Sequence, residues 1–193
     1  KRTYILVLVA MINLLLVYVS YQSYSFTKSK DYELKIEAAT IMKNALDLTK
    51  GLDNPKDIDR FKSGLVGVDS TSSQMTTKRG FLESKVATTN PNFAAVFIDW
   101  FSAIGISSDV SNTPDTVAVS MTGSFPGANI AFLAACKASN VYPVIISSIG
   151  SSSWGANQID KTWIEIENTL IDANFFSYRS KAFSVGGDND QLA

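Results

Sequence analysis

The sequence predicts an α/β fold with an open, mainly parallel, Rossmann-like sheet and flanking helices. The central observation is the stretch 115–148, in which strand-like runs at residues 116–119 and 142–146 flank an apolar helical run at 128–139. A strand, a crossover helix and a second strand within about thirty residues is the size of a βαβ unit. Both strand-like runs are apolar with little alternation, which predicts parallel strands covered on both faces. The helix follows a Gly/Pro loop at 121–127, Pro126 suits its first turn, and Asn140 can end it in the left-handed region.

An N-terminal membrane anchor is predicted to precede this fold. Residues 4–21 are apolar except for Asn13 and Ser20, and about 18 such residues just span a bilayer core. The competing interpretations are a cleaved signal peptide and a buried helix. Because no small-residue cleavage site follows, we favour an uncleaved, single-pass anchor over residues 1–22.

Basic residues bear on the orientation of this anchor. Lys1 and Arg2 precede the apolar run, so the positive-inside rule places them in the cytosol and the following domain outside the cell membrane. Lys28, Lys30 and Lys35 follow the run and weaken that orientation. We therefore expect a membrane protein whose soluble domain is more readily extracytoplasmic than cytosolic.

Residues 31–52 read as an amphipathic helix. The apolar residues repeat at coiled-coil spacing: Leu34, Ala38, Ile41, Ala45, Leu48 and Leu52. Packing of this stripe on its own domain is preferred over a homodimer through residues 31–52, because the stripe is shorter than three heptads. With the polar, proline-containing stretch that follows, residues 23–62 form a helix and connector, and residues 63–193 form the α/β domain.

Four further elements are expected in that domain. A brief strand is predicted at residues 65–68, and a helix capped by Asp160 should run to about residue 173, followed by a last strand at 180–185. An amphipathic helix should run from Asn90 to Gly105, with its large apolar residues in the core: Phe93, Val96, Phe97, Trp100, Phe101 and Ile104.

Composition excludes several classes of function. The net charge is −1 and no cluster of lysine and arginine occurs, so the chain lacks the electrostatic footprint of a nucleic-acid-binding protein. There is no histidine, which removes the commonest general base and the commonest transition-metal ligand. The single Cys136 lies in an apolar helical run, where we expect a small buried hydrophobe that forms no intrachain disulfide.

Loops rich in small hydroxyl, amide and glycine residues follow the predicted strands, at residues 69–77, 122–127, 148–157 and 186–190. In an open parallel sheet such loops lie together at the carboxyl edge, where ligands bind. The loop before the central helix also offers backbone N–H groups to an anion. A carboxylate, phosphate or peptide-like ligand suits this edge. The predicted ligand-binding residues are Thr76, Thr77, Gly123, Ser124, Asn129, Ser152, Ser153, Trp154, Asn157, Gly186 and Gly187.

Catalysis and metal binding find weaker support. Ser124 is a candidate nucleophile, with Lys78, Lys85 or a carboxylate as its base, although no complete nucleophile or phosphate-loop motif is present. Asp69 and Asp188 are weak catalytic candidates, and together with Asp190 they are candidates to hold a hard cation such as Mg²⁺. Simple turn chemistry explains any one of these loops equally well. No cofactor is identified by the sequence.

Several of these loop segments resemble one known family, the poly-gamma-glutamate system proteins, which are membrane-associated bacterial proteins found with the machinery that makes and exports poly-γ-glutamate. The resemblance covers about residues 65–190 and the N-terminal apolar run. The matching segments are residues 76–85, 88–95, 120–129, 144–148 and 153–157, with a looser match at 183–190. Family members continue past the Gly-Gly loop, so the resemblance implies a C-terminally short chain. It implies a pathway and partners among the poly-γ-glutamate synthesis and export proteins, and it carries over no catalytic residue.

Three functions are consistent with these observations. The first is a membrane-anchored accessory component that binds a glutamate-derived ligand or a polymer end at the loops. The slightly acidic charge argues against a long electropositive track for the polyanion. The second is an enzyme of the same pathway that acts on a γ-glutamyl amide or an activated glutamate. The third is a structural scaffold of the synthase complex.

Overall fold

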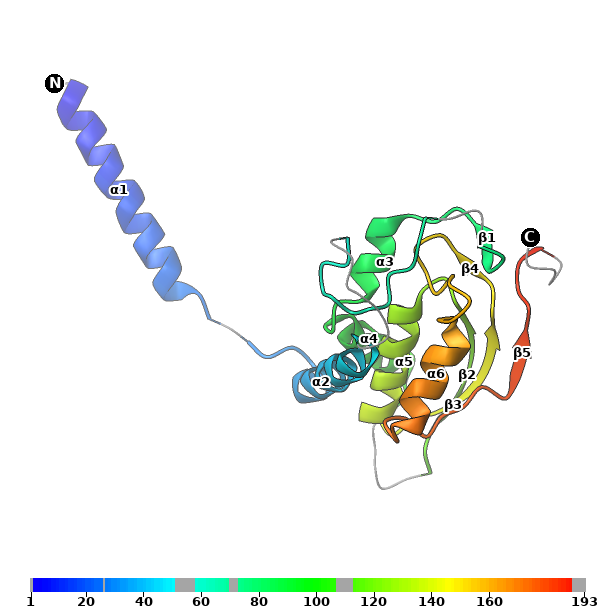
Figure 1. Cartoon of the computed structure of the whole chain (residues 1–193). Helices are drawn as coiled ribbons and strands as arrows, with labels where there is room; N and C mark the ends of the chain where they lie inside the picture. The colour runs from blue at the N-terminus through cyan, green and yellow to red at the C-terminus, as the bar shows by residue number, and fades with distance from the viewer. Residues whose placement is uncertain (1, 26, 51–57, 70–72, 107–112, 189–193) are drawn as a thin grey trace. The chain divides into compact units, whose positions relative to one another are not determined.

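The computed structural model describes residues 2–25, 27–50, 58–69, 73–106 and 113–188 (Figure 1). The chain divides into two compact units, Lys1–Lys30 and Asp31–Ala193. The first contains α1 (Arg2–Ser23), a straight apolar helix of 22 residues with a mean hydropathy of 2.3 and no buried residue. By length and composition α1 can cross a membrane, and the same features fit a signal sequence near the N-terminus.

The second unit begins with α2 (Tyr32–Thr49), which packs against three helices of its own domain, α4 (Phe93–Ala103), α5 (Pro126–Ala138) and α6 (Trp163–Asp172). Ala38, Met42 and Ala45 are fully buried there, which confirms the expected packing of the helix on its own domain. The buried stripe is rotated from the predicted one, because Leu48 is 41% exposed while Leu46 is buried. Self-association through residues 31–52 stays a prediction.

The main sheet contains three parallel strands in the order β2-β3-β5. Strands β2 (Thr116–Thr122) and β3 (Tyr142–Ser148) pair in register along their whole length, and α5 (Pro126–Ala138) crosses between them. The predicted βαβ unit is therefore confirmed. Strand β5 (Ala182–Ser184) pairs with the carboxyl end of β3, as the expected last strand.

Among the described residues, helices cover one face of this sheet and the other is open, so the prediction of two covered faces was wrong. Figure 1 shows α5 and α6 (Trp163–Asp172) against the same side of β2 and β3. Side chains alternate in burial along both strands: Met121 and Ile145 point into the core, while Tyr142, Val144 and Ile146 are exposed. The open face carries mainly hydroxyl and small residues on β2 and larger apolar residues on β3.

A second, two-stranded parallel sheet is made by β1 (Thr76–Lys78) and β4 (Ser151–Ser152). The strand expected at residues 65–68 is not part of a sheet. That segment instead hydrogen-bonds to one loop, with Gly67 N donating to the Trp154 carbonyl at 3.1 Å and Trp154 N donating to the Val68 carbonyl at 3.1 Å. A short helix that the sequence did not predict, α3 (Leu82–Thr88), follows β1.

Two of the predicted helices differ in detail. Helix α4 (Phe93–Ala103) buries Phe101 but leaves Trp100 56% exposed, and Ile104, just after it, is 71% exposed, so neither is a core residue. Helix α6 begins later than expected, because Thr162 and Glu165 form a capping box and Asp160 stays outside the helix. The start of α6 is encoded locally by the Thr162-x-x-Glu165 capping box, which the sequence analysis did not use, whereas the exposure of Trp100 depends on how α4 packs.

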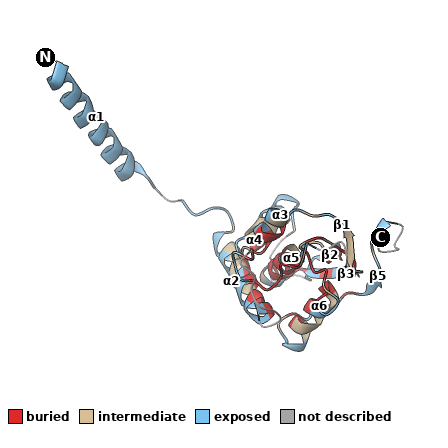
Figure 2. Cartoon of the chain, turned by 45° about the horizontal axis from the view of Figure 1, so that its top comes forward, coloured by how far each residue is buried: buried red, intermediate tan, exposed pale blue. Residues whose placement is uncertain are grey.

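The core is centred on α5, ten of whose residues are buried (Figure 2). Its apolar residues contact α2 and α4 on one side and the sheet on the other. Cys136 is fully buried among them, and burial raises the pKa of its thiol to about 12. The expectation of a small buried cysteine is confirmed.

Candidate functional site

Loops from distant parts of the chain meet at the carboxyl ends of β2, β3 and β5. Ala156 N donates to the Gly123 carbonyl at 2.7 Å, which joins the loops after β2 and β3. Gly150 N donates to the Val185 carbonyl at 2.9 Å, which joins the loop after β3 to the segment after β5. Lys78 Nζ, in β1, lies 2.9 Å from an Asp188 carboxylate oxygen. Ser151 N also donates to the Met75 carbonyl at 2.9 Å, so described residues of all four predicted loop regions meet at this sheet edge.

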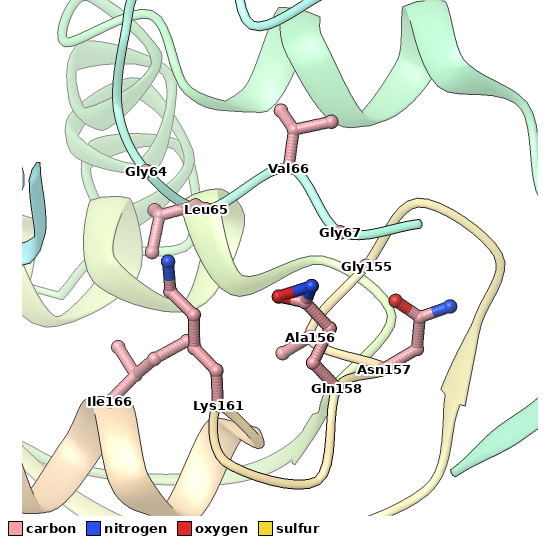
Figure 3. Close-up of a pocket in the computed structure, with 10 residues that line it drawn as sticks. All are labelled: Gly64, Leu65, Val66, Gly67, Gly155, Ala156, Asn157, Gln158, Lys161 and Ile166. Carbon is pink, nitrogen blue, oxygen red and sulfur yellow. The ribbon is translucent and has the colours of Figure 1, made fainter. Parts of the chain in front are cut away.

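Glycine allows the backbones to approach closely at these crossings. A Cβ atom on Gly67 would lie 2.0 Å from the Gly155 carbonyl oxygen, and a Cβ on Gly155 would lie 2.5 Å from the Gly123 carbonyl oxygen. Figure 3 shows the hollow where residues 64–67 run beside residues 155–158. It leaves no interior space for a water molecule, so this crossing is a packed contact and not a ligand pocket.

Asn157 holds this crossing together. Its side chain is fully buried, its Oδ1 accepts from Val68 N at 3.0 Å, and its Nδ2 donates to the Val68 carbonyl at 2.7 Å and to Thr76 Oγ1 at 3.0 Å. These bonds satisfy both backbone groups of Val68. The Asn157 amide and the Thr76 hydroxyl are therefore engaged in hydrogen bonds within the protein.

Asn129 and Ser124 have comparable internal partners. Asn129 Nδ2 donates to the Thr122 carbonyl at 2.9 Å, and Ser124 N donates to Thr122 Oγ1 at 3.2 Å. Ser124 Oγ accepts from Ser152 N at 3.0 Å and has no lysine or carboxylate partner among the described residues. Both residues therefore position the loop after β2.

A groove of about 390 Å³ lies on the open face of the sheet, at its carboxyl end. Its polar lining comes from hydroxyl groups of all three strands and from the two glycines after β5. The lining includes Ser120, Thr122, Ser148, Ser184, Gly186 and Gly187, with Ile146 and Phe183 as apolar walls. This groove, rather than the packed crossing, offers room for a ligand.

The most unusual side-chain contact at the edge joins Lys85 to Ser152. Lys85, in α3, is only 3% exposed, and its Nζ donates to Ser152 Oγ at 2.7 Å. The same Nζ lies 3.5 Å from the centroid of the Phe125 ring. Burial lowers the pKa of Lys85 to about 8. The sequence proposed Lys85 as a base but paired it with Ser124; only the fold places it beside Ser152.

Three further predicted residues lie at the same edge. Ser153 is fully buried, and its Oγ has no hydrogen-bond partner among the described residues. Trp154 is half-buried with φ at +67°, a strained conformation for a side chain of this size. Thr77 is half-buried in β1. The unsatisfied hydroxyl of Ser153 marks a place where the protein alone does not complete the hydrogen bonding.

The acidic candidates are dispersed. Asp69 is exposed, Asp188 pairs with Lys78, and Asp190 lies outside the described residues. Among the residues that the structure describes, no three aspartate, glutamate, cysteine or histidine side chains gather in a way that could hold a metal ion. Mg²⁺ binding by Asp69, Asp188 and Asp190 stays a prediction.

When the chain is compared with known proteins, no family model, no curated protein and no solved structure matches it.

Proposed function

We propose that this chain is a membrane-anchored accessory component of poly-γ-glutamate synthesis or export, and that its α/β domain binds a glutamate-derived ligand or a polymer end. The proposed site is the groove at the carboxyl end of the sheet, in keeping with the ligand position of open, Rossmann-like sheets. The observation that carries the proposal is the meeting of four polar loop regions beside a groove of about 390 Å³. That volume lies within the range of small-ligand sites, at about 300–1,000 Å³.

The chemistry of the groove suits a ligand with carboxylate and amide groups. Ser120, Thr122 and Ser148 supply hydroxyls that donate to carboxylate oxygens and accept from amide N–H groups. Ile146 and Phe183 supply apolar surface for the methylene groups of a glutamyl side chain. The groove's volume of about 390 Å³ favours recognition of a chain end over a long stretch of polymer.

In this proposal α1 is the anchor, and the domain works on the extracytoplasmic side of the cell membrane beside the synthesis and export proteins. The exposed apolar surface along all of α1 supports an anchor, since such a surface is costly in water. Protease accessibility of the domain in intact cells tests its side of the membrane.

Isothermal titration of the full chain in detergent tests the binding site. We expect γ-linked glutamate oligomers to bind more tightly than α-linked oligomers of the same length. Ser120→Leu, which fills the groove, should weaken binding about tenfold or more, equivalent to about 1.4 kcal/mol. Thr116→Leu is the matched control, because Thr116 is exposed on the same face at the other end of β2. If Ser120→Leu binds the oligomer as tightly as Thr116→Leu, the groove is not the binding site.

An enzyme of the same pathway is the second candidate, and a scaffold of the synthase complex is the third. The Lys85–Ser152 contact specifically favours the enzyme, because it pairs a hydroxyl with a buried amine.

A further inference from the structure

Lys85 is a buried cationic residue without an anionic partner. Within the part of the chain that the structure describes, its Nζ contacts the Ser152 hydroxyl and the Phe125 ring and forms no ion pair. Structural lysines are rarely buried without a carboxylate, because the charged form loses its hydration. Burial therefore lowers the pKa of the Lys85 ammonium to about 8, although the contact with the Phe125 ring retains part of the stabilisation of the charge.

Ser152 is placed as an oriented nucleophile would be. It lies half-exposed in β4, and its backbone N donates to Ser124 Oγ at 3.0 Å, which ties β4 to the loop after β2. Its Oγ is 2.7 Å from Lys85 Nζ, within the range for proton transfer from a hydroxyl to a general base. Ser124 has no such neighbour, so the structure moves the candidate nucleophile from Ser124 to Ser152.

The backbone of Gly80 lies directly against that hydroxyl, where a larger residue would not fit. A Cβ atom at residue 80 would lie 3.0 Å from Ser152 Oγ and 2.6 Å from the Ser153 carbonyl oxygen. The backbone N–H of Gly80 donates to no acceptor among the described residues. A backbone N–H without an acceptor is the kind of donor that can stabilise an oxyanion.

Two roles for Lys85 can be compared. As an ammonium group it would serve as the counter-charge for a ligand carboxylate, but Phe125 and Ser152 already cover its Nζ and leave it 3% exposed. As an amine it would accept the proton of Ser152. The pKa of Lys85, lowered to about 8, makes the neutral amine a minority form at pH 7 and a substantial fraction at pH 8. The geometry favours the second role.

We propose that Ser152 and Lys85 are a nucleophile and general-base pair that cleaves or transfers an acyl group from an amide bearing a nearby carboxylate. For the substrate class this inference rests on the proposed function, since a γ-glutamyl amide is such a compound. Arg79 precedes Gly80, is exposed and forms no ion pair among the described residues, so it is available to the substrate carboxylate.

The reaction needs no partner other than water or an acceptor amine. Lys85 takes the Ser152 proton as Oγ attacks the carbonyl carbon; the C–N bond then breaks, and the Lys85 ammonium gives its proton to the leaving amine. Water attacks the resulting ester with Lys85 again as base, which releases the carboxylic acid and restores the serine. An acceptor amine in place of water gives transfer instead of hydrolysis.

The test is covalent labelling of the full chain in detergent with a fluorophosphonate, followed by peptide mass spectrometry. The expected adduct lies on Ser152, formed as the O–P bond is made and fluoride leaves. Hydrolysis of γ-glutamyl-p-nitroanilide, which releases coloured p-nitroaniline, provides a turnover assay on the same sample. Arg79→Ala should raise KM while leaving kcat nearly unchanged.

Variants separate the proposed roles. Ser152→Ala should abolish the adduct, and Lys85→Arg, which keeps the charge but cannot act as a base, should slow labelling about 100-fold or more. Ser177→Ala and Lys43→Arg, both at exposed positions far from this pair in the sequence, are the matched controls and should label normally. Thermal melting of each variant checks that it is folded. If Lys85→Arg does not fold, Lys85→Gln replaces it as the variant that lacks the general base.

The outcomes distinguish this inference from the binding role. An unlabelled Ser152 in the folded wild-type protein overturns the inference, as does normal labelling of Lys85→Arg. If γ-glutamyl oligomers still bind in titration, the proposed function survives that failure. If Ser152 is labelled but these oligomers do not bind, the Ser152–Lys85 pair is supported as a nucleophile and base. The proposal of a glutamate-derived ligand is then rejected.

Discussion

Replacing Asn157 with alanine tests whether the loop edge is held by the protein's own hydrogen bonds or by a ligand. The change removes three hydrogen bonds, two to the backbone of Val68 and one to Thr76. Each buried group that is left unsatisfied costs about 1–3 kcal/mol. The Val68 carbonyl keeps its bond from Trp154 N, so the groups that lose a partner are Val68 N–H and the Thr76 hydroxyl. Because Val68 is only half-buried, water can replace part of this loss, and we expect a total of about 3 kcal/mol.

Thermal unfolding followed by circular dichroism measures this loss. For a domain of this size, about 3 kcal/mol lowers the Tm by about 6–12 °C. Asn168→Ala is the control, because Asn168 accepts a single exposed hydrogen bond from Arg179, and its Tm should change by less than about 2 °C. If Asn157→Ala keeps the wild-type Tm but loses ligand binding, the amide is a ligand group and the structural interpretation is refuted.

Three other substitutions or reagents probe the fold and the candidate site. Thr162→Ala removes the capping box with Glu165 and should lower stability by about 1 kcal/mol, read as a fall in Tm of about 2–4 °C; an unchanged Tm would contradict the cap. Raising the pH from 8 to 10.5 should stabilise the wild type relative to Lys85→Met, since the folded lysine loses its proton first, with an upper bound of about 3 kcal/mol. Denaturant titrations at each pH measure this difference, and a constant difference would show that Lys85 is not desolvated. Cys136 should resist iodoacetamide at pH 8 in the native protein and react after unfolding in urea, whereas rapid native alkylation would show an accessible thiol.

The βαβ unit could be predicted because its signals are local. β-branched and apolar runs, a proline at the helix start and an asparagine at its end lie within one stretch, and Asn140 indeed adopts φ of +52°. The open face of the sheet could also have been predicted from β2, because Val117, Val119 and Met121 alternate there with hydroxyl and small residues, as in a strand with one exposed face. In β3 the exposed positions are Tyr142, Val144 and Ile146, which hide the alternation.

The small sheet and the site chemistry depend on contacts across long sequence separations. Strands β1 and β4 are three and two residues long and pair across about seventy residues, so neither has a periodic pattern to detect. The sequence placed hydroxyl and amide groups at the sheet edge, but it could not distinguish Asn157, which serves the backbone, from the hydroxyls that line the groove. The Lys85–Ser152 contact was missed because α3 went unpredicted. A lysine between Leu82 and Val86 on a short helix was its only signal.

Amide hydrogen exchange of the full chain, with and without a γ-linked glutamate oligomer, tests most directly whether a ligand binds at the carboxyl edge of the sheet. Binding there predicts slower exchange in residues 122–127, 148–157 and 186–188, with α2 and α4 unchanged. Protection confined to other elements, or no protection at concentrations that saturate the titration, would contradict the account.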